Sequence, residues 1–458
     1  ACGDHGHVAS RILVQHLGSL RVSAATTKGL VSLRNEWLRV WADSLALWSC
    51  FVQLHEPKWC FTKAEEKREQ LSGSFAMIRL IDHSVVVSLR QVAAEGLAPF
   101  AREILAHEIG HHVYCPADLT DNARLLARVR HGLPTMEHWA PMVSNLYSDL
   151  LINDRLQRIA ELDIAGVYRQ LGSDSQARLW TLTMRIYELL WKLPRSQLAH
   201  GDCDARLNHD AQLGARLIRS YARDWLGGAG RFAALCLRYV TQDDENQISR
   251  LLVVWSDTRC AGHGGLPEGL AEIDDAEITG AIHPAEDPEL SGIDALEADA
   301  GRSSGRVPGE LSGRKSIKNC RQPFEYADLL KAAGAELDER ELTARYYREL
   351  ATPHLIPFPV KRLPLATDPL PEGLDVWDVD SPLEQVDWFD TFLTSPVVIP
   401  GVTTVERHYG ESPGSESRET PFDLYLGIDC SGSMGDPAHH LSYPILAGTI
   451  MALSALRA

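Results

Sequence analysis

The stretch ILAHEIGHHVY, residues 104–114, limits most strongly how this chain can fold. It contains His107, Glu108 and His111 in the order HExxH. On a helix, histidines four residues apart lie on one face, close enough to share a metal ion, and the glutamate lies beside them. Two His nitrogens, a third protein ligand and one open position are the usual coordination of a catalytic zinc ion. The pattern therefore predicts a helix that binds zinc through His107 and His111, with Glu108 as the base that acts on a water.

The residues around the motif favour a buried helix over a chance HExxH on a solvated one. Ile104, Leu105, Ile109 and Val113 supply an apolar face. A glycine inside a helix costs about 1 kcal/mol relative to alanine, so Gly110 predicts a close packing partner, such as a strand running under the helix. We expect His112 to be a neighbour in the wall of the site and not a ligand.

A polar row farther along the chain supplies the predicted third ligand. Asn145, Asp149 and Asn153 are spaced by four, which places them on one helical face. Buried polar groups need partners, and a metal ion is a suitable one. We predict that Asp149 is the third zinc ligand and that Asn145 and Asn153 orient Asp149 or the bound water. A row of helix caps or a solvated stripe is the alternative.

Three other carboxylates follow the motif and compete for the same role. Asp118, Asp121 and Glu137 lie in a loop-rich segment. Their spacing does not place them together on one face of a helix. Asp149 is therefore preferred as the third zinc ligand.

The segments on either side of the motif predict its surroundings. Residues 8–55 carry tryptophans at helical spacing, typical of a buried helical face. Residues 75–89 predict a pair of strands, whose outer edge could pair with an extended peptide. Residues 156–240 predict a helical scaffold.

The chain changes character after residue 240. Residues 243–304 are crowded with Asp and Glu, which predicts a solvated linker or insert. Helical signal returns at 324–330 and 336–350. Prolines between residues 353 and 371 then predict an open, stiff connector. Its acidic and aromatic end, residues 377–390, is expected to anchor the connector on a neighbouring domain; covering the protease cleft is the alternative.

A second chemical motif lies near the end of the sequence. The apolar run 422–428 predicts a strand that leads into Asp429, Ser431 and Ser433, and residues 443–456 predict a helix. A carboxylate and two hydroxyls offer oxygen ligands suited to Mg²⁺.

Both motifs together resemble a known arrangement. Over about residues 70–160, the strand pair, the HEIGHH helix, the Cys-Pro loop and the Asn-x-x-x-Asp-x-x-x-Asn helix resemble the metallopeptidase domain that bacteria fuse to von Willebrand factor A domains. The resemblance implies a zincin-like fold and, as partner, the MoxR-type AAA+ ATPase often encoded with such proteins. The DxSxS motif resembles the metal-ion-dependent adhesion site of a von Willebrand factor A domain, where the metal accepts a carboxylate of a partner protein. Such a domain needs about 150 residues, so we expect the sequence to contain only its beginning.

Composition excludes some partners. The formal charge of −17 disfavours nucleic acid, and with it a nuclease, because phosphate binding needs a basic surface. The sequence lacks an apolar run of the roughly 20 residues that span a membrane. It also lacks the basic and apolar start of a signal peptide, and its nine cysteines include no CxxC pair. These features predict a cytoplasmic protein with reduced thiols.

The sequence thus predicts an α+β fold with a mainly helical, zincin-like domain and the start of an α/β doubly wound domain. The expected divisions are an N-terminal helical region at 1–70, a metallopeptidase domain at 71–240, an acidic linker at 241–320, a helical and Pro-rich connector at 321–420 and a truncated von Willebrand factor A-like domain at 421–458. The predicted function is zinc-dependent hydrolysis of a protein or peptide. The alternative is a non-catalytic, metal-stabilised adaptor that links an AAA+ ATPase to client proteins.

Overall fold

The structure, a computed structural model, divides into two compact units. It describes residues 28–71, 73–172, 177–243, 266–290, 319–362, 367–413, 419–429, 431 and 434–458. The first unit runs up to Tyr346 and includes Asp436–Leu441; the second contains Tyr347–Gly435 and Ser442–Ala458. This division differs from the five segments predicted from the sequence, because the N-terminal helices and the acidic segment both belong to the first unit.

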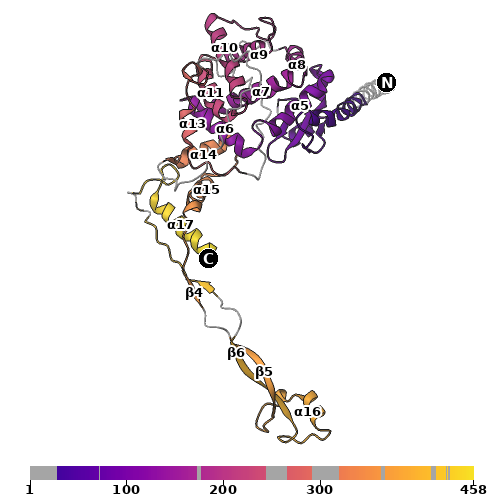
Figure 1. The fold of residues 1–458 in the computed structure, drawn as a ribbon, viewed down its shortest axis with the longest axis vertical. Helices are drawn as coiled ribbons and strands as arrows, with labels where there is room; N and C mark the ends of the chain where they lie inside the picture. The colour runs from indigo at the N-terminus through magenta and orange to yellow at the C-terminus, as the bar shows by residue number, and fades with distance from the viewer. Residues whose placement is uncertain are drawn as a thin grey trace, which may run out of the picture. The chain divides into compact units, whose positions relative to one another are not determined.

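The first unit is mainly helical with one small sheet, which confirms the α+β class at a coarse level (Figure 1). A helix covers residues 28–39. The strands are β1 (Lys58–Cys60), β2 (Ala76–Arg79) and β3 (Ser84–Ser88). The further helices are α2 (Trp41–Ala46), α3 (Lys63–Arg68), α4 (Leu89–Ala94), α5 (Ala101–Val113), α6 (Leu119–Gly132), α7 (Ala140–Arg158), α8 (Ile164–Leu171), α9 (Arg178–Leu190), α10 (Ala205–Ser220), α11 (Trp225–Gln242), α13 (Asp275–Thr279), α14 (Pro323–Ala332) and α15 (Glu339–Ala351), the last of which continues into the second unit.

The sheet contains the strand pair predicted from residues 75–89. β2 and β3 are antiparallel, and β1 adds to β3 in parallel, in the order β1-β3-β2. Residues 76–78 of β2 are at most 3% exposed. The prediction that the outer edge of this strand is open to a peptide is therefore wrong for these residues, since a peptide can pair only with an accessible backbone.

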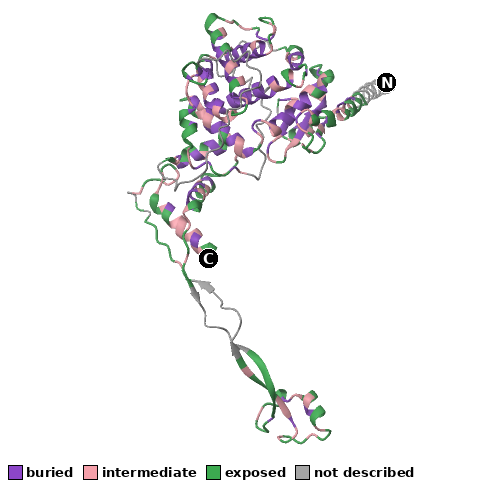
Figure 2. Ribbon diagram, in the orientation of Figure 1, coloured by how far each residue is buried: buried purple, intermediate pink, exposed green. Residues whose placement is uncertain are grey.

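A single hydrophobic core joins the N-terminal helices to the motif helix (Figure 2). Trp37 and Trp41 are buried in the same cluster as Ile104 and Ile109 of α5. The tryptophan stripe is thus core, as its helical spacing predicted, and it packs against the helix that carries the HExxH motif.

Local sequence explains where the helices of the site begin. A short 3-10 turn, Ala98–Phe100, contains Pro99 and leads directly into α5. Proline also occupies the first turn of α7, where its missing N–H removes no helical hydrogen bond. Asp118 caps α6, because its side chain accepts from the backbone N–H of Asp121.

The acidic segment differs from the predicted solvated linker in the part that the structure describes. Within residues 266–290, Glu277 and Asp287 are buried. Glu277 pairs with Arg321 and His131, while Asp287 accepts hydrogen bonds from Tyr221 and Arg231. These ion pairs attach the segment to the helices of the first unit.

In its described residues, the second unit contains paired strands, the end of α15 and the helices α16 and α17. β5 (Thr367–Val376) pairs with β6 (Val405–Pro413), and β4 (Val360–Arg362) pairs with β7 (Glu419–Pro421), both antiparallel. The connector predicted as open therefore forms hydrogen-bonded ribbons. Helix α16 (Trp388–Thr394) lies between β5 and β6, and α17 (Tyr443–Arg457) confirms the last predicted helix.

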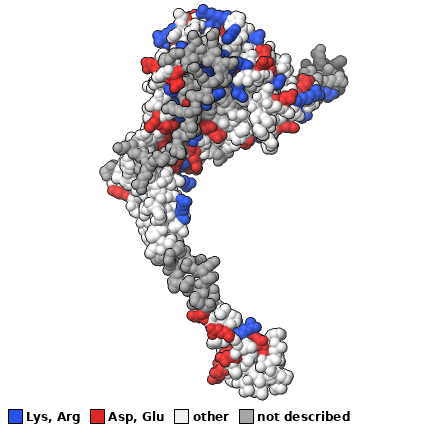
Figure 3. Space-filling model, in the orientation of Figure 1, with Lys and Arg blue, Asp and Glu red and all other residues white. Residues whose placement is uncertain are grey.

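Acidic side chains surround β5, β6 and α16 (Figure 3). Arg407 is the one Lys or Arg residue in the sequence of residues 372–407. Their Asp and Glu residues are Glu372, Asp375, Asp378, Asp380, Glu384, Asp387, Asp390 and Glu406. Several large apolar side chains of this segment are exposed, among them Phe389 at 72% and Leu393 at 69%.

The strand predicted at residues 422–428 is wrong. These residues form no strand in the structure, and Tyr425 is 93% exposed. An apolar run becomes a strand only when another strand pairs with it, and the run itself does not specify that partner.

Candidate metal centre

Helix α5 brings the two motif histidines together as their spacing predicts. The Nε2 atoms of His107 and His111 lie 3.2 Å apart, and the rings are almost perpendicular. His111 is fully buried, and the side chain of His107 is 14% exposed. One ring therefore lies inside the core and the other borders a cleft.

Helix α7 places Asp149 against both rings. Asp149 Oδ1 lies 3.6 Å from His107 Nε2 and 3.3 Å from His111 Nε2. Among the described residues, these three form the one group of His, Cys, Asp or Glu side chains whose ligand atoms gather closely enough to hold a metal ion. The structure thus assembles the three residues predicted as ligands, although His111 and Asp149 lie 38 positions apart in sequence.

The competing carboxylates have other roles. Asp118 caps α6, Asp121 pairs with Arg124, and Glu137 accepts a hydrogen bond from the backbone of Thr135. None of the three belongs to the group around His107.

Hydrogen bonds on the far side of each ring fix where its lone pair points. His111 Nδ1 lies 3.1 Å from the carbonyl oxygen of Cys115, and His107 Nδ1 lies 2.8 Å from Asn153 Oδ1. Both oxygens can only accept, so both Nδ1 atoms carry the hydrogen. Each Nε2 atom then carries no hydrogen, and both Nε2 atoms lie near Asp149 Oδ1.

Asn145 and Asn153 both orient ligands, but Asn153 does so differently from the prediction. Asn145 Nδ2 donates to Asp149 Oδ2 over 3.1 Å, which leaves Oδ1 to face the histidines. Asn153, predicted to orient Asp149 or a water, instead accepts from His107. Its Nδ2 donates to the hydroxyls of Tyr168 and Tyr187 at 3.1 and 2.8 Å, which fixes the orientation of its amide.

The three ligand atoms fit a zinc ion. Zinc bonds of about 2.1 Å in a tetrahedron place neighbouring ligand atoms about 3.4 Å apart. The observed separations are 3.2, 3.3 and 3.6 Å. Two nitrogen lone pairs and a carboxylate oxygen at these distances repel one another unless a cation lies between them, so the donor set matches a divalent metal.

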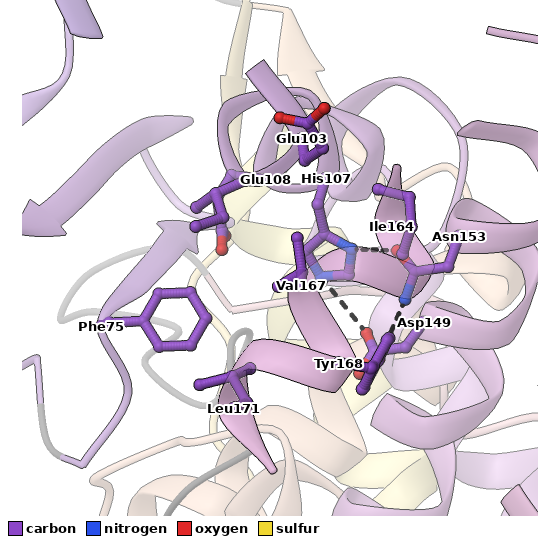
Figure 4. Close-up of a pocket in the computed structure, with 11 residues that line it drawn as sticks. Phe75, Glu103, His107, Glu108, Asp149, Asn153, Ile164, Val167, Tyr168 and Leu171 are labelled. Carbon is purple, nitrogen blue, oxygen red and sulfur yellow. Dashed lines mark hydrogen bonds and ion pairs between the residues drawn. The ribbon is translucent and has the colours of Figure 1, made fainter. Parts of the chain in front are cut away.

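A cleft opens beside His107 and Asp149 (Figure 4). The open space in it, part of which is continuous with solvent, is about 470 Å³. Glu108, which is 1% exposed, lines it together with His107 and Asp149. The other lining residues are Phe75, Glu103, Ile104, Asn153, Ile164, Val167, Tyr168 and Leu171.

Trp48 and Ile152 explain the glycine in the motif. A Cβ atom at Gly110 would lie 2.6 Å from the Trp48 ring and 2.7 Å from Ile152 Cγ2. Trp48 Nε1 also donates to the carbonyl oxygen of Ala106 over 2.7 Å. The close partner of Gly110 is thus a tryptophan and helix α7, and not the strand that the sequence analysis expected.

His112 lies in the wall, as predicted. Its ring packs on His83, with centroids 4.1 Å apart. Burial lowers the pKa of His112, and the charge of the neighbouring His83 lowers it further. His112 is not a member of the group formed by His107, His111 and Asp149.

Sequence reasoning missed the tyrosines behind the site. Tyr168 lies on α8 and Tyr187 on α9, within residues 156–240, where aromatic residues at helical spacing predict only a packed helical scaffold. Their hydroxyl groups could have indicated a role at the site, because a buried tyrosine needs a hydrogen-bond partner. Here that partner is Asn153.

The DxSxS motif lies in the second unit and is described in part. Asp429 Oδ1 accepts from the backbone N–H of Ser431, and Asp429 Oδ2 accepts from the Ser431 hydroxyl. Ser433 lies outside the described residues. The predicted magnesium site is therefore neither assembled nor excluded by these contacts.

No family model matches the chain, and no curated protein or solved structure matches it either. Within the described part of the chain, none of the helices combines the length and the apolar character needed to cross a membrane.

Proposed function

We propose that this protein is a zinc-dependent metallopeptidase. The observation that carries the proposal is the convergence of the ligand atoms of His107, His111 and Asp149 at the edge of a cleft that Glu108 also lines. These three residues would hold the zinc ion. When bound, zinc would lower the pKa of a water and polarise a substrate carbonyl.

The protein's own groups have distinct roles in the proposed reaction. Glu108 accepts a proton from the attacking water and passes it to the leaving amine. Asn153 holds the His107 ring, and Asn145 holds the Asp149 carboxylate. The apolar side chains around the cleft limit access of bulk water to Glu108.

Metal analysis combined with a cleavage assay tests the proposal. We expect about one zinc per chain in the wild type and a loss of zinc in His107→Ala, His111→Ala and Asp149→Ala. Glu108→Gln should keep the zinc and lose cleavage of an unfolded protein such as casein by 100-fold or more, because general acid–base catalysis contributes about 10²–10⁴-fold. Wild type without zinc after reconstitution, or equal cleavage by Glu108→Gln, would overturn the proposal.

A second function, that of an adaptor, is supported by the exposed apolar side chains of α16. Phe389, Phe392 and Leu393 of this helix are all more than half exposed, and exposed apolar clusters are typical of protein contacts. In this proposal the zinc is structural, and Asp429, Ser431 and Ser433 bind Mg²⁺ and thereby a partner such as a MoxR-type AAA+ ATPase. A chelator separates the two functions: removing a catalytic zinc stops cleavage and leaves the fold intact, whereas removing a structural zinc unfolds the first unit.

A further inference from the structure

The cleft beside His107 has one wall that is almost entirely apolar. Phe75 precedes β2, and Ile164, Val167 and Leu171 come from one face of α8. Ile164 and Val167 are buried, whereas Phe75 and Leu171 are half-buried. In Figure 4, Phe75 and Leu171 lie on the side of the cleft opposite Asn153, across the space in front of the His107 ring.

Helix α8 is held at both ends, so this wall is preformed. The side chain of Asp163 accepts from the backbone N–H of Gly166 at the start of the helix. Gln157 on α7 accepts from the backbone N–H of Ala165. At the other end, Gly172 closes the helix in the left-handed conformation. A preformed wall binds a ligand without the entropic cost of ordering it.

Tyr168 connects the wall to the metal ligands. Its side chain lines the cleft, and its hydroxyl accepts from Asn153, the residue that holds His107. The position of α8 relative to the metal centre is therefore set by a hydrogen-bonded path, and a side chain lodged against α8 lies at a fixed place relative to Glu108.

The charges of the cleft select against acidic ligands. Its lining contains the carboxylates of Glu103, Glu108 and Asp149, and no Lys or Arg is among the described residues that line it. An Asp or Glu side chain would lose its hydration against the apolar wall and face three carboxylates. A leucine or phenylalanine side chain would bury apolar surface at no such cost.

We propose that this wall is the specificity site of the peptidase: it binds a large apolar side chain, of leucine or phenylalanine size, next to the scissile bond, and Leu171 determines that choice. The inference rests on the proposed function and adds the substrate class. Substrates are then peptides or unfolded proteins in which an apolar residue flanks the cleaved bond.

Profiling of cleavage sites tests the inference. The zinc-loaded wild type is incubated with a library of peptides from a digested proteome, and the residues on both sides of each cleaved bond are identified by mass spectrometry. We expect Leu, Ile, Met or Phe at one fixed side of the bond at least 10-fold more often than Asp or Glu, a ratio that a hydrophobic pocket can supply. Cleavage with Asp or Glu equally frequent at both sides would overturn the inference and leave the peptidase proposal standing.

Two variants at one position provide the control. Leu171→Arg should reverse the preference, at least 10-fold, toward Asp or Glu, because it adds a positive charge to the wall. A gain of new cleavage sites cannot come from misfolding. Leu171→Met keeps size and polarity and should keep the wild-type preference. Unchanged preference in Leu171→Arg would show that α8 does not contact the substrate.

Binding provides a readout that does not need cleavage. The Glu108→Gln variant is titrated with fluorescein-labelled hexapeptides that differ at one position, Leu or Asp, and fluorescence anisotropy is measured. Tighter binding of the Leu peptide by 10-fold or more, lost in Glu108→Gln combined with Leu171→Arg, supports the pocket even if the wild type cleaves nothing. Equal binding of both peptides would overturn it.

Discussion

Asn153 holds His107 in place: its Oδ1 lies 2.8 Å from His107 Nδ1, while its Nδ2 donates to Tyr168 and Tyr187. The amide of Asn153 thus forms hydrogen bonds with three neighbouring side chains at once. Because the tyrosine hydroxyls take its two N–H groups, only the oxygen is left for His107. This arrangement turns the unprotonated Nε2 atom of His107 toward Asp149 and His111.

The first prediction concerns this contact. Asn153→Ala should weaken zinc binding by about 10–100-fold, the usual effect of removing a residue that orients a metal ligand. Asn153→Asp should bind zinc within a few-fold of wild type, because a carboxylate still accepts from His107 and the tyrosines can donate to it. The measurement is a competition titration with a chelating dye. Equal affinity of Asn153→Ala and wild type would mean that packing alone orients His107.

The second prediction concerns the packing under the motif helix. Gly110→Ala adds a Cβ atom 2.6 Å from Trp48 and 2.7 Å from Ile152. Overpacking a core costs about 1–3 kcal/mol, and alanine returns about 1 kcal/mol of helix propensity. We expect a net loss of about 1–2 kcal/mol in the free energy of unfolding, measured by urea denaturation.

The control for this prediction is Gly29→Ala, another helical glycine. A Cβ atom there meets nothing within 4 Å, so the substitution should be neutral or stabilising. If Gly110→Ala proves as stable as Gly29→Ala, Trp48 and Ile152 do not confine α5. A further test is Trp48→Phe, which removes the hydrogen bond to Ala106 and should relieve part of the crowding in the double variant.

The cluster of His107, His111 and Asp149 could be predicted because these residues obey a helical period. The spacing of His107 and His111, and of Asn145, Asp149 and Asn153, places each set on one helix face, whatever the tertiary fold. The pairing of the two helices followed from chemistry, since both faces are buried and polar. What each asparagine contacts did not follow, because the partners of Asn153 come from α8 and α9 and their tyrosines have the pattern of ordinary core residues.

Long-range pairing explains the other differences. Acidic residues dominate residues 243–304, and this composition predicts a solvated segment. Glu277 is nevertheless buried by pairing with Arg321, 44 residues later, and with His131, far earlier in the chain. Composition describes average solvation and contains no information about such pairs. The same holds for β5, whose partner β6 lies beyond α16.

The last prediction tests the ion pairs of Glu277. Burial raises the pKa of this carboxyl, but hydrogen bonds from His131 and Arg321 outweigh burial, so its pKa lies below the ordinary value. A carboxyl with a lowered pKa in the folded state stabilises the fold above the unfolded pKa of about 4.3, and this stabilisation is lost as the pH falls through the folded value. Glu277→Gln should therefore lower the free energy of unfolding at pH 7 by about 3 kcal/mol, as expected when one partner of a buried pair is removed.

The pH dependence of this difference and a control variant at Glu286 test whether the ion pairs of Glu277 stabilise the fold. In urea denaturation, the difference between wild type and Glu277→Gln should begin to shrink below about pH 4.3 and disappear below the lower pKa of the folded state, where the wild-type carboxyl is also neutral. Glu286→Gln, at an exposed position of the same segment, should change the free energy by less than about 0.5 kcal/mol at either pH. If Glu277→Gln changes the free energy of unfolding as little as Glu286→Gln does, the pairing of Glu277 with Arg321 and His131 does not hold this segment on the first unit.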